Sequence, residues 1–170
     1  RRVLFRSTIV DAPITAATNG RDAIYGREFV DGLTDKELAF LVLHENMHKC
    51  YRHLTTWRGL YEKNQPLANI ACDHVINLQL VAMDQSEKLI AMPKYKEGEH
   101  RGKNMGCLDT RFTGMDAKQV FDILEKEQKD KGGDGGENSD IVSVSSGHGR
   151  SEEHTSELQS RETISYAVFC

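Results

Sequence analysis

The residues best suited to chemistry are His44, Glu45 and His48, which follow the pattern H-E-x-x-H. Residues four apart lie one turn apart on the same face of a helix, so both imidazoles can reach one metal ion. Zinc is held by such nitrogen ligands and activates water, and a neighbouring glutamate can take the proton of that water. The pattern therefore predicts a zinc site with His44 and His48 as ligands and Glu45 as the general base.

The motif must be carried by a helix, and the surrounding sequence predicts one over residues 35–54. Thr34 and Glu37 form the pattern of a capping box at its start. Apolar residues recur around the motif at helical spacing, namely Phe40, Leu41, Leu43, Met47 and Leu54. A competing interpretation is a structural pair of buried histidines with an exposed glutamate, in which both rings need hydrogen-bond partners.

A second helix is expected to begin at Pro66, a favoured first helical position, and to end near residue 82 or 83. Its interior is rich in apolar residues, yet Asn69, Asp73 and Asn77 are spaced four apart and form a polar stripe on one face. Asp73 is the natural third zinc ligand, because a carboxylate from another helix leaves the fourth position for water. Asn77 or Asn69 would hold a ligand in place by a hydrogen bond. The alternative is a polar stripe that faces solvent.

Other residues compete for the role of third ligand. His53 follows the motif closely, but its spacing is one residue short of the longer metzincin pattern and the glycine of that pattern is absent. The other interpretation of His53 is an exposed histidine at the end of the helix. His74 and Cys72 lie on other faces of the second helix and are the remaining rivals.

The remaining sequence patterns predict a small sheet and one more helix. Residues 12–18 and 21–25 flank Asn19-Gly20, a strong signal for a β-hairpin. This hairpin either borders a cleft and pairs with an extended substrate or is simply structural. Residues 55–65 are polar and predict a loop, whereas residues 115–128 predict an amphipathic helix.

Four blocks, in order, resemble one known family. They are TAATNGRDAIYGREFV at 15–30, LVLHENMHKCYRH at 41–53, LANIACDHVIN at 67–77 and LDTRFTGMDAKQVFDIL at 108–124. Together they resemble a predicted metallopeptidase domain of bacterial and phage proteins, which commonly precedes a von Willebrand A-like domain. The resemblance covers about residues 12–128. It implies an α+β, mainly helical, zincin-like domain with a small β-hairpin or sheet, and it carries over His44, Glu45 and His48, with Asp73 in a shared block.

The chain ends differ in character from this domain. Residues 150–160 (RSEEHTSELQS), 164–170 (ISYAVFC) and 4–7 (LFRS) resemble the in-frame translation of sequencing adapters. We therefore expect residues 1–7 and 150–170 to be adapter read-through, and residues 8–128 to form the metallopeptidase-like domain. Residues 129–149, rich in glycine and charge, are expected to be a flexible linker.

Composition limits the possible partners. A formal net charge of -4 provides no basic surface for nucleic acid, and no apolar run approaches the length of a membrane span. Cys50, Cys72 and Cys107 lack C-x-x-C spacing, which favours reduced thiols and a cytoplasmic location. The expected partners are a peptide or protein substrate and a von Willebrand A-like domain.

The sequence thus predicts a zinc-dependent metallohydrolase, specifically a peptidase, with Zn2+ as its cofactor. A different class of function is also open. The domain would then bind zinc only to stabilise itself and would act as a non-catalytic interaction module beside a von Willebrand A-like domain. A site closed by a fourth protein ligand would favour the module, and an open position beside Glu45 would favour the enzyme.

Overall fold

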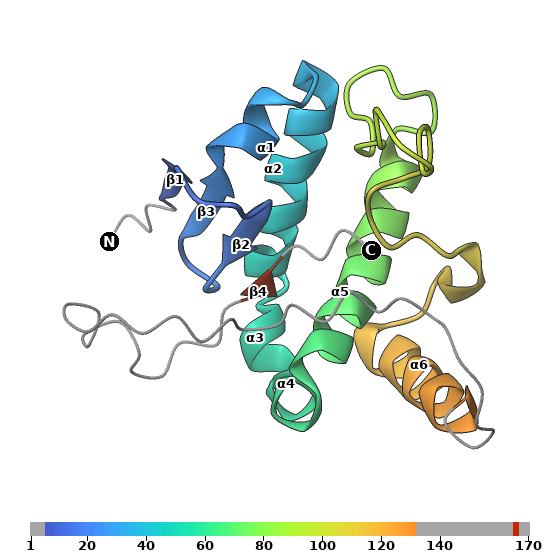
Figure 1. The fold of residues 1–170 in the computed structure, drawn as a ribbon. Coiled ribbons are helices and arrows are strands. Elements are labelled where there is room, and N and C mark those ends of the chain that lie inside the picture. The colour runs from blue at the N-terminus through green and yellow to red at the C-terminus, as the bar shows by residue number, and fades with distance from the viewer. Residues whose placement is uncertain (1–5, 132–164, 167–170) are drawn as a thin grey trace.

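The computed structural model describes residues 6–131 and 165–166, and the fold is α+β and mainly helical, as predicted (Figure 1). The strands are β1 (Ser7–Val10), β2 (Ala16–Thr18), β3 (Ala23–Gly26) and β4 (Ser165–Tyr166). The helices are α1 (Arg27–Asp31), α2 (Asp35–Cys50), α3 (His53–Thr56), α4 (Arg58–Lys63), α5 (Gln65–Met83), the 3-10 turn η1 (Thr110–Phe112) and α6 (Ala117–Lys131). None of the helices in the described part of the chain combines the length and the apolarity that crossing a membrane requires.

The sheet has the strand order β1-β3-β2-β4. β2 and β3 form the predicted antiparallel hairpin, in which Ala16 is opposite Tyr25. The Asn19 side chain closes its turn by accepting hydrogen bonds from the backbone N–H groups of Arg21 and Asp22, at 3.0 and 2.7 Å. β1 adds to the sheet parallel to β3, and β4 pairs antiparallel with β2.

Helix α2 lies between this sheet and helix α5 (Figure 1). The predicted capping box is confirmed at its start: Thr34 accepts from the Glu37 N–H, and the Glu37 carboxylate accepts from the Thr34 N–H at 2.8 Å. Leu41 packs with the buried residues of β2 and β3, whereas Phe40 packs with Ile76 and other residues of α5. Both sides of α2 are therefore buried, and the motif lies at the centre of the molecule.

Helix α5 begins at Gln65, one residue before the predicted start, because the Asn64 side chain accepts a hydrogen bond from the Leu67 N–H. Helices α4 and α6 pack against it (Figure 1). The three residues of the polar stripe, Asn69, Asp73 and Asn77, are all buried, so the stripe does not face solvent. An apolar cluster lies where α4, η1 and α6 pack against α5. It comprises Leu60, Tyr61, Leu67, Ala68, Ala71, Cys72, Phe112, Ala117, Val120 and Phe121.

Three sequence predictions about the helices were wrong in extent. Helix α2 ends at Cys50 rather than at residue 54, because Arg52 takes a left-handed conformation with φ 52°, which breaks the helix. Residues 55–65 are not a loop: they contribute to α3 and α4, which form where Leu60 and Tyr61 can pack against α5. Helix α6 spans 117–131 instead of 115–128, so the first residues of the predicted linker are helical.

The remainder of the predicted linker, residues 132–149, and residues 150–164 and 167–170 of the predicted adapter segment lie outside the described residues. The prediction of reduced thiols holds for Cys50 and Cys72, which are free. It was wrong for Cys107, which is disulfide-bonded.

Candidate metal centre

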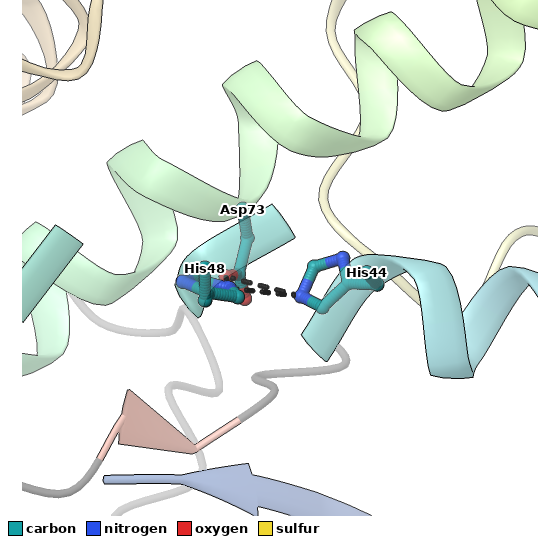
Figure 2. A group of neighbouring side chains, drawn as sticks. All are labelled: His44, His48 and Asp73. Carbon is teal, nitrogen blue, oxygen red and sulfur yellow. Dashed lines mark hydrogen bonds and ion pairs between the residues drawn. The ribbon is translucent and has the colours of Figure 1, made fainter. Parts of the chain in front are cut away.

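Three potential ligand atoms converge between α2 and α5 (Figure 2). His44 and His48 extend from successive turns of α2, and Asp73 reaches them from α5. The Nε2 atoms of the two histidines are 3.1 Å apart. The Asp73 Oδ1 atom lies 3.0 Å from His48 Nε2 and 3.5 Å from His44 Nε2. The structure thus brings the three predicted ligands to one point.

The spacing of these atoms fits a tetrahedral zinc ion. Ligand atoms about 2.0–2.1 Å from zinc are separated by roughly 3.3 Å along the edge of a tetrahedron. The three observed separations, 3.0, 3.1 and 3.5 Å, bracket that value. Two imidazoles and one carboxylate are also a donor set that zinc accepts while keeping a fourth position for water.

Burial makes a positive charge necessary at this point. His44, His48 and Asp73 are each less than 5% exposed. Burial alone would raise the pKa of Asp73, but the contacts with His44 and His48 outweigh it and lower that pKa. Burial likewise opposes the protonation of His44, yet the Asp73 carboxylate raises the His44 pKa. A buried carboxylate that is held ionised requires a cation beside it, either a proton on a histidine or a metal.

Asn77 contacts the His44 nitrogen that lies away from the ligand cluster. The Nδ2 group of Asn77 donates to the Cys107 carbonyl at 2.9 Å, which turns its Oδ1 atom toward His44. His44 Nδ1 lies 2.8 Å from that oxygen and donates to it, so Nε2 is left facing the ligand cluster. Asn69, the other candidate for this role, accepts from the Tyr61 hydroxyl at 3.4 Å.

Glu45 is 1% exposed, and neither of its carboxylate oxygens has a hydrogen-bond partner among the described residues. Burial raises the pKa of Glu45 to about 7 against the opposing charge of His44. A buried carboxylate without partners is costly, and such groups occur where a water molecule or a substrate completes their hydrogen bonding. Glu45 therefore has the properties expected of a general base beside the ligand cluster.

His53 is not an exposed histidine at the end of a helix, so that interpretation was wrong. His53 is 4% exposed, and burial together with the nearby His48 lowers the pKa of the His53 ring to about 3. Its Nδ1 atom lies 3.1 Å from Nδ1 of His48, on the opposite side of that ring from the ligand cluster. His53 thus contacts a predicted ligand without joining the three converging atoms.

Among the described residues, the other two candidate ligands, His74 and Cys72, do not belong to the ligand cluster. His74 packs edge-on against Phe112, with ring centroids 4.9 Å apart. Cys72 is buried in the apolar cluster between α5 and α6, and burial raises its thiol pKa to about 12. A thiol that stays protonated is a poor metal ligand.

Two residues near Glu45 were not identified from the sequence. Lys49 is 5% exposed; burial lowers the pKa of its ammonium group, against the charge of Glu45. It lies one turn after Glu45, so the spacing of four residues could have indicated it. Tyr25 belongs to β3, and burial and the Glu45 charge raise its pKa to about 12. No local pattern links Tyr25 to the motif, because packing alone brings β3 against α2.

The chain is similar to a known protein family. A family model described as "Putative metallopeptidase domain" matches residues 3–161. No curated protein and no solved structure matches the chain significantly.

Proposed function

Because the chain belongs to the putative metallopeptidase domain family, we propose that it is a zinc-dependent peptidase that acts on peptide or protein substrates. The observation that carries the proposal is the convergence of two imidazole nitrogens and one carboxylate oxygen. Glu45, whose oxygens have no hydrogen-bond partner in the described part of the chain, follows the first of these ligands directly.

Each residue of the site has a separate role in the proposed reaction. His44, His48 and Asp73 would hold the zinc ion. When bound, zinc supplies a Lewis acid that polarises the scissile carbonyl and lowers the pKa of the attacking water. Glu45 takes the proton of that water and later delivers it to the leaving amine. Asn77 keeps the His44 ring in the tautomer whose Nε2 atom is free to bind.

The test combines zinc content with hydrolysis of a fluorogenic peptide library by the full chain. We expect about one zinc per chain in the wild type and a zinc-dependent cleavage activity. Glu45→Gln should retain zinc and lose at least about 100-fold in activity, since it removes the general base but no ligand. Asp73→Ala should lose both zinc and activity.

Glu62→Gln is the matched control, because Glu62 is an exposed glutamate on α4 paired with Arg58. It should change neither zinc content nor hydrolysis. Full hydrolysis by purified Glu45→Gln would exclude Glu45 as the base. Unchanged zinc content in Asp73→Ala would remove Asp73 from the ligand set.

A second function is favoured by one observation, the near-complete burial of the ligands and of Glu45. A zinc ion closed off from substrate would serve only to stabilise an interaction module, with a von Willebrand A-like domain as its partner. The visible spectrum of the Co2+-loaded protein separates the two proposals. Titration with a small zinc-binding inhibitor such as a hydroxamate shifts the spectrum of an open site and leaves that of a closed site unchanged.

A further inference from the structure

Both nitrogens of the His48 ring are engaged, and they face different partners. Nε2 points to the ligand cluster, 3.0 Å from Asp73 Oδ1 and 3.1 Å from His44 Nε2. Nδ1 lies 3.1 Å from Nδ1 of His53. Both rings are buried, and their planes are nearly perpendicular at 88°. The contact with His53 therefore involves the nitrogen that the ligand cluster does not use.

A hydrogen bond between two ring nitrogens needs one donor and one acceptor. If Nε2 of His48 presents its lone pair to a cation, the ring hydrogen must be on Nδ1. His48 Nδ1 then donates to His53 Nδ1, and His53 carries its own hydrogen on Nε2. We propose that His53 is a positioning residue, which fixes the tautomer and the orientation of His48 so that Nε2 faces the metal.

The other histidine of the site provides an internal comparison. His44 is held in the same way, because its Nδ1 atom contacts Asn77 Oδ1 at 2.8 Å. Each ring thus has a neutral acceptor behind it, one from α5 and one from the start of α3. Such partners make a metal-binding histidine more rigid and more basic.

The break in the helix after α2 allows the contact between His53 and His48. A continuous helix would place a residue five positions further on about 140° around the axis from His48. Instead, Arg52 adopts a left-handed conformation, and α3 begins at His53. After this break the His53 ring lies edge-on to the His48 ring, with ring centroids 5.0 Å apart.

The experiment compares His53→Asn with His53→Leu in the full chain. The two side chains have nearly the same shape, but only asparagine places an acceptor oxygen near the position of Nδ1. Zinc dissociation constants are measured by competition with a chromophoric chelator, and Co2+ spectra and metal-free thermal unfolding are recorded for each variant. We expect His53→Leu to bind zinc about 10- to 100-fold more weakly and His53→Asn to stay within about threefold of wild type.

The Co2+ spectrum should keep the wild-type band intensity in both variants, because neither loses a ligand. Equal weakening in both variants, or none in His53→Leu, would overturn the proposal. A reduced band intensity in His53→Asn would also overturn it, since His53 would then be a ligand itself. The inference rests on the zinc site of the proposed function but not on hydrolysis. A wild type that binds zinc and cleaves no peptide would refute the peptidase and leave this test intact.

Discussion

At the scale of single residues, the site is defined by what lies behind its ligands as much as by the ligands themselves. The Asn77 amide could face His44 with either its oxygen or its nitrogen. The Cys107 carbonyl accepts from Nδ2 and so settles the orientation. One backbone carbonyl thereby fixes the amide, the amide fixes the His44 tautomer, and the free Nε2 atom is directed at Asp73.

Replacement of Asn77 by leucine should therefore weaken zinc binding about 10- to 100-fold, because His44 loses the acceptor that orients it. The zinc dissociation constant, measured by chelator competition, checks this expectation. Asn69→Leu is the control on the same helix, since the Asn69 side chain accepts a hydrogen bond from the Tyr61 hydroxyl. It should destabilise the fold without changing zinc affinity. Equal zinc affinity in Asn77→Leu and wild type would contradict the role of Asn77.

At the scale of elements, the capping box does more than begin helix α2. The Glu37 carboxylate accepts from the Thr34 N–H and hydroxyl, and also from the Lys94 N–H at 3.2 Å. It therefore ties the first turn of α2 to the loop that follows α5. Burial acts to raise the Glu37 pKa, but these hydrogen bonds outweigh it and lower that pKa.

Because the Glu37 pKa is lower in the folded chain than its ordinary value of 4.5, its ionised form stabilises the fold above that value. The contribution should disappear as the pH falls through the folded pKa. Glu37→Ala should cost about 1 kcal/mol of unfolding free energy at neutral pH, and the difference from wild type should shrink in acid. Urea denaturation from about pH 7 to about pH 3 measures both quantities.

The matched control is Glu62→Ala, which removes an exposed glutamate from another helix. It should change the free energy of unfolding by less than about 0.5 kcal/mol. A Glu37→Ala deficit that stays constant down to the lowest pH would show that the carboxylate charge contributes nothing to the cap.

At the scale of the whole molecule, the candidate metal centre joins the two longest helices at the middle of the fold. His44 and His48 belong to α2, which also packs against the sheet. Asp73 belongs to α5, against which α4 and α6 pack (Figure 1). A cation at this point would bridge the two halves of the structure. Zinc binding and global stability should therefore be coupled.

Removal of the metal by a chelator should lower the unfolding temperature. Free zinc at 1,000 times its dissociation constant adds about 4 kcal/mol. For a chain of 170 residues this corresponds to roughly 8–16 °C. Differential scanning calorimetry with and without EDTA measures the shift. Added Zn2+ should restore the original temperature, whereas Mg2+, which prefers oxygen ligands, should not.

Asp73→Ala serves as the control for this effect, since a chain that has lost a ligand should respond little to EDTA. An unfolding temperature that is the same with and without the chelator in the wild type would contradict a zinc ion bridging α2 and α5.

Local spacing in the sequence was enough to predict several features of the fold and of the site. The capping box at Thr34 and Glu37 and the hairpin at Asn19-Gly20 formed as predicted, because each needs only residues a few positions apart. The pairing of His44 with His48 and the stripe through Asp73 likewise follow from helical periodicity. The predicted ligands could therefore be named before their distances were known, and their role in holding zinc stays a prediction.

Features that depend on contacts between distant segments could be seen only in the folded chain. Periodicity could not distinguish Asn77 from Asn69, because only the packing of α5 against α2 and Cys107 places one of them behind His44. Nor could it show that α2 stops at Cys50, since the left-handed conformation of Arg52 and the burial of His53 depend on the packing of the segments around them. Local pattern specifies the face of a helix, and packing specifies what that face meets.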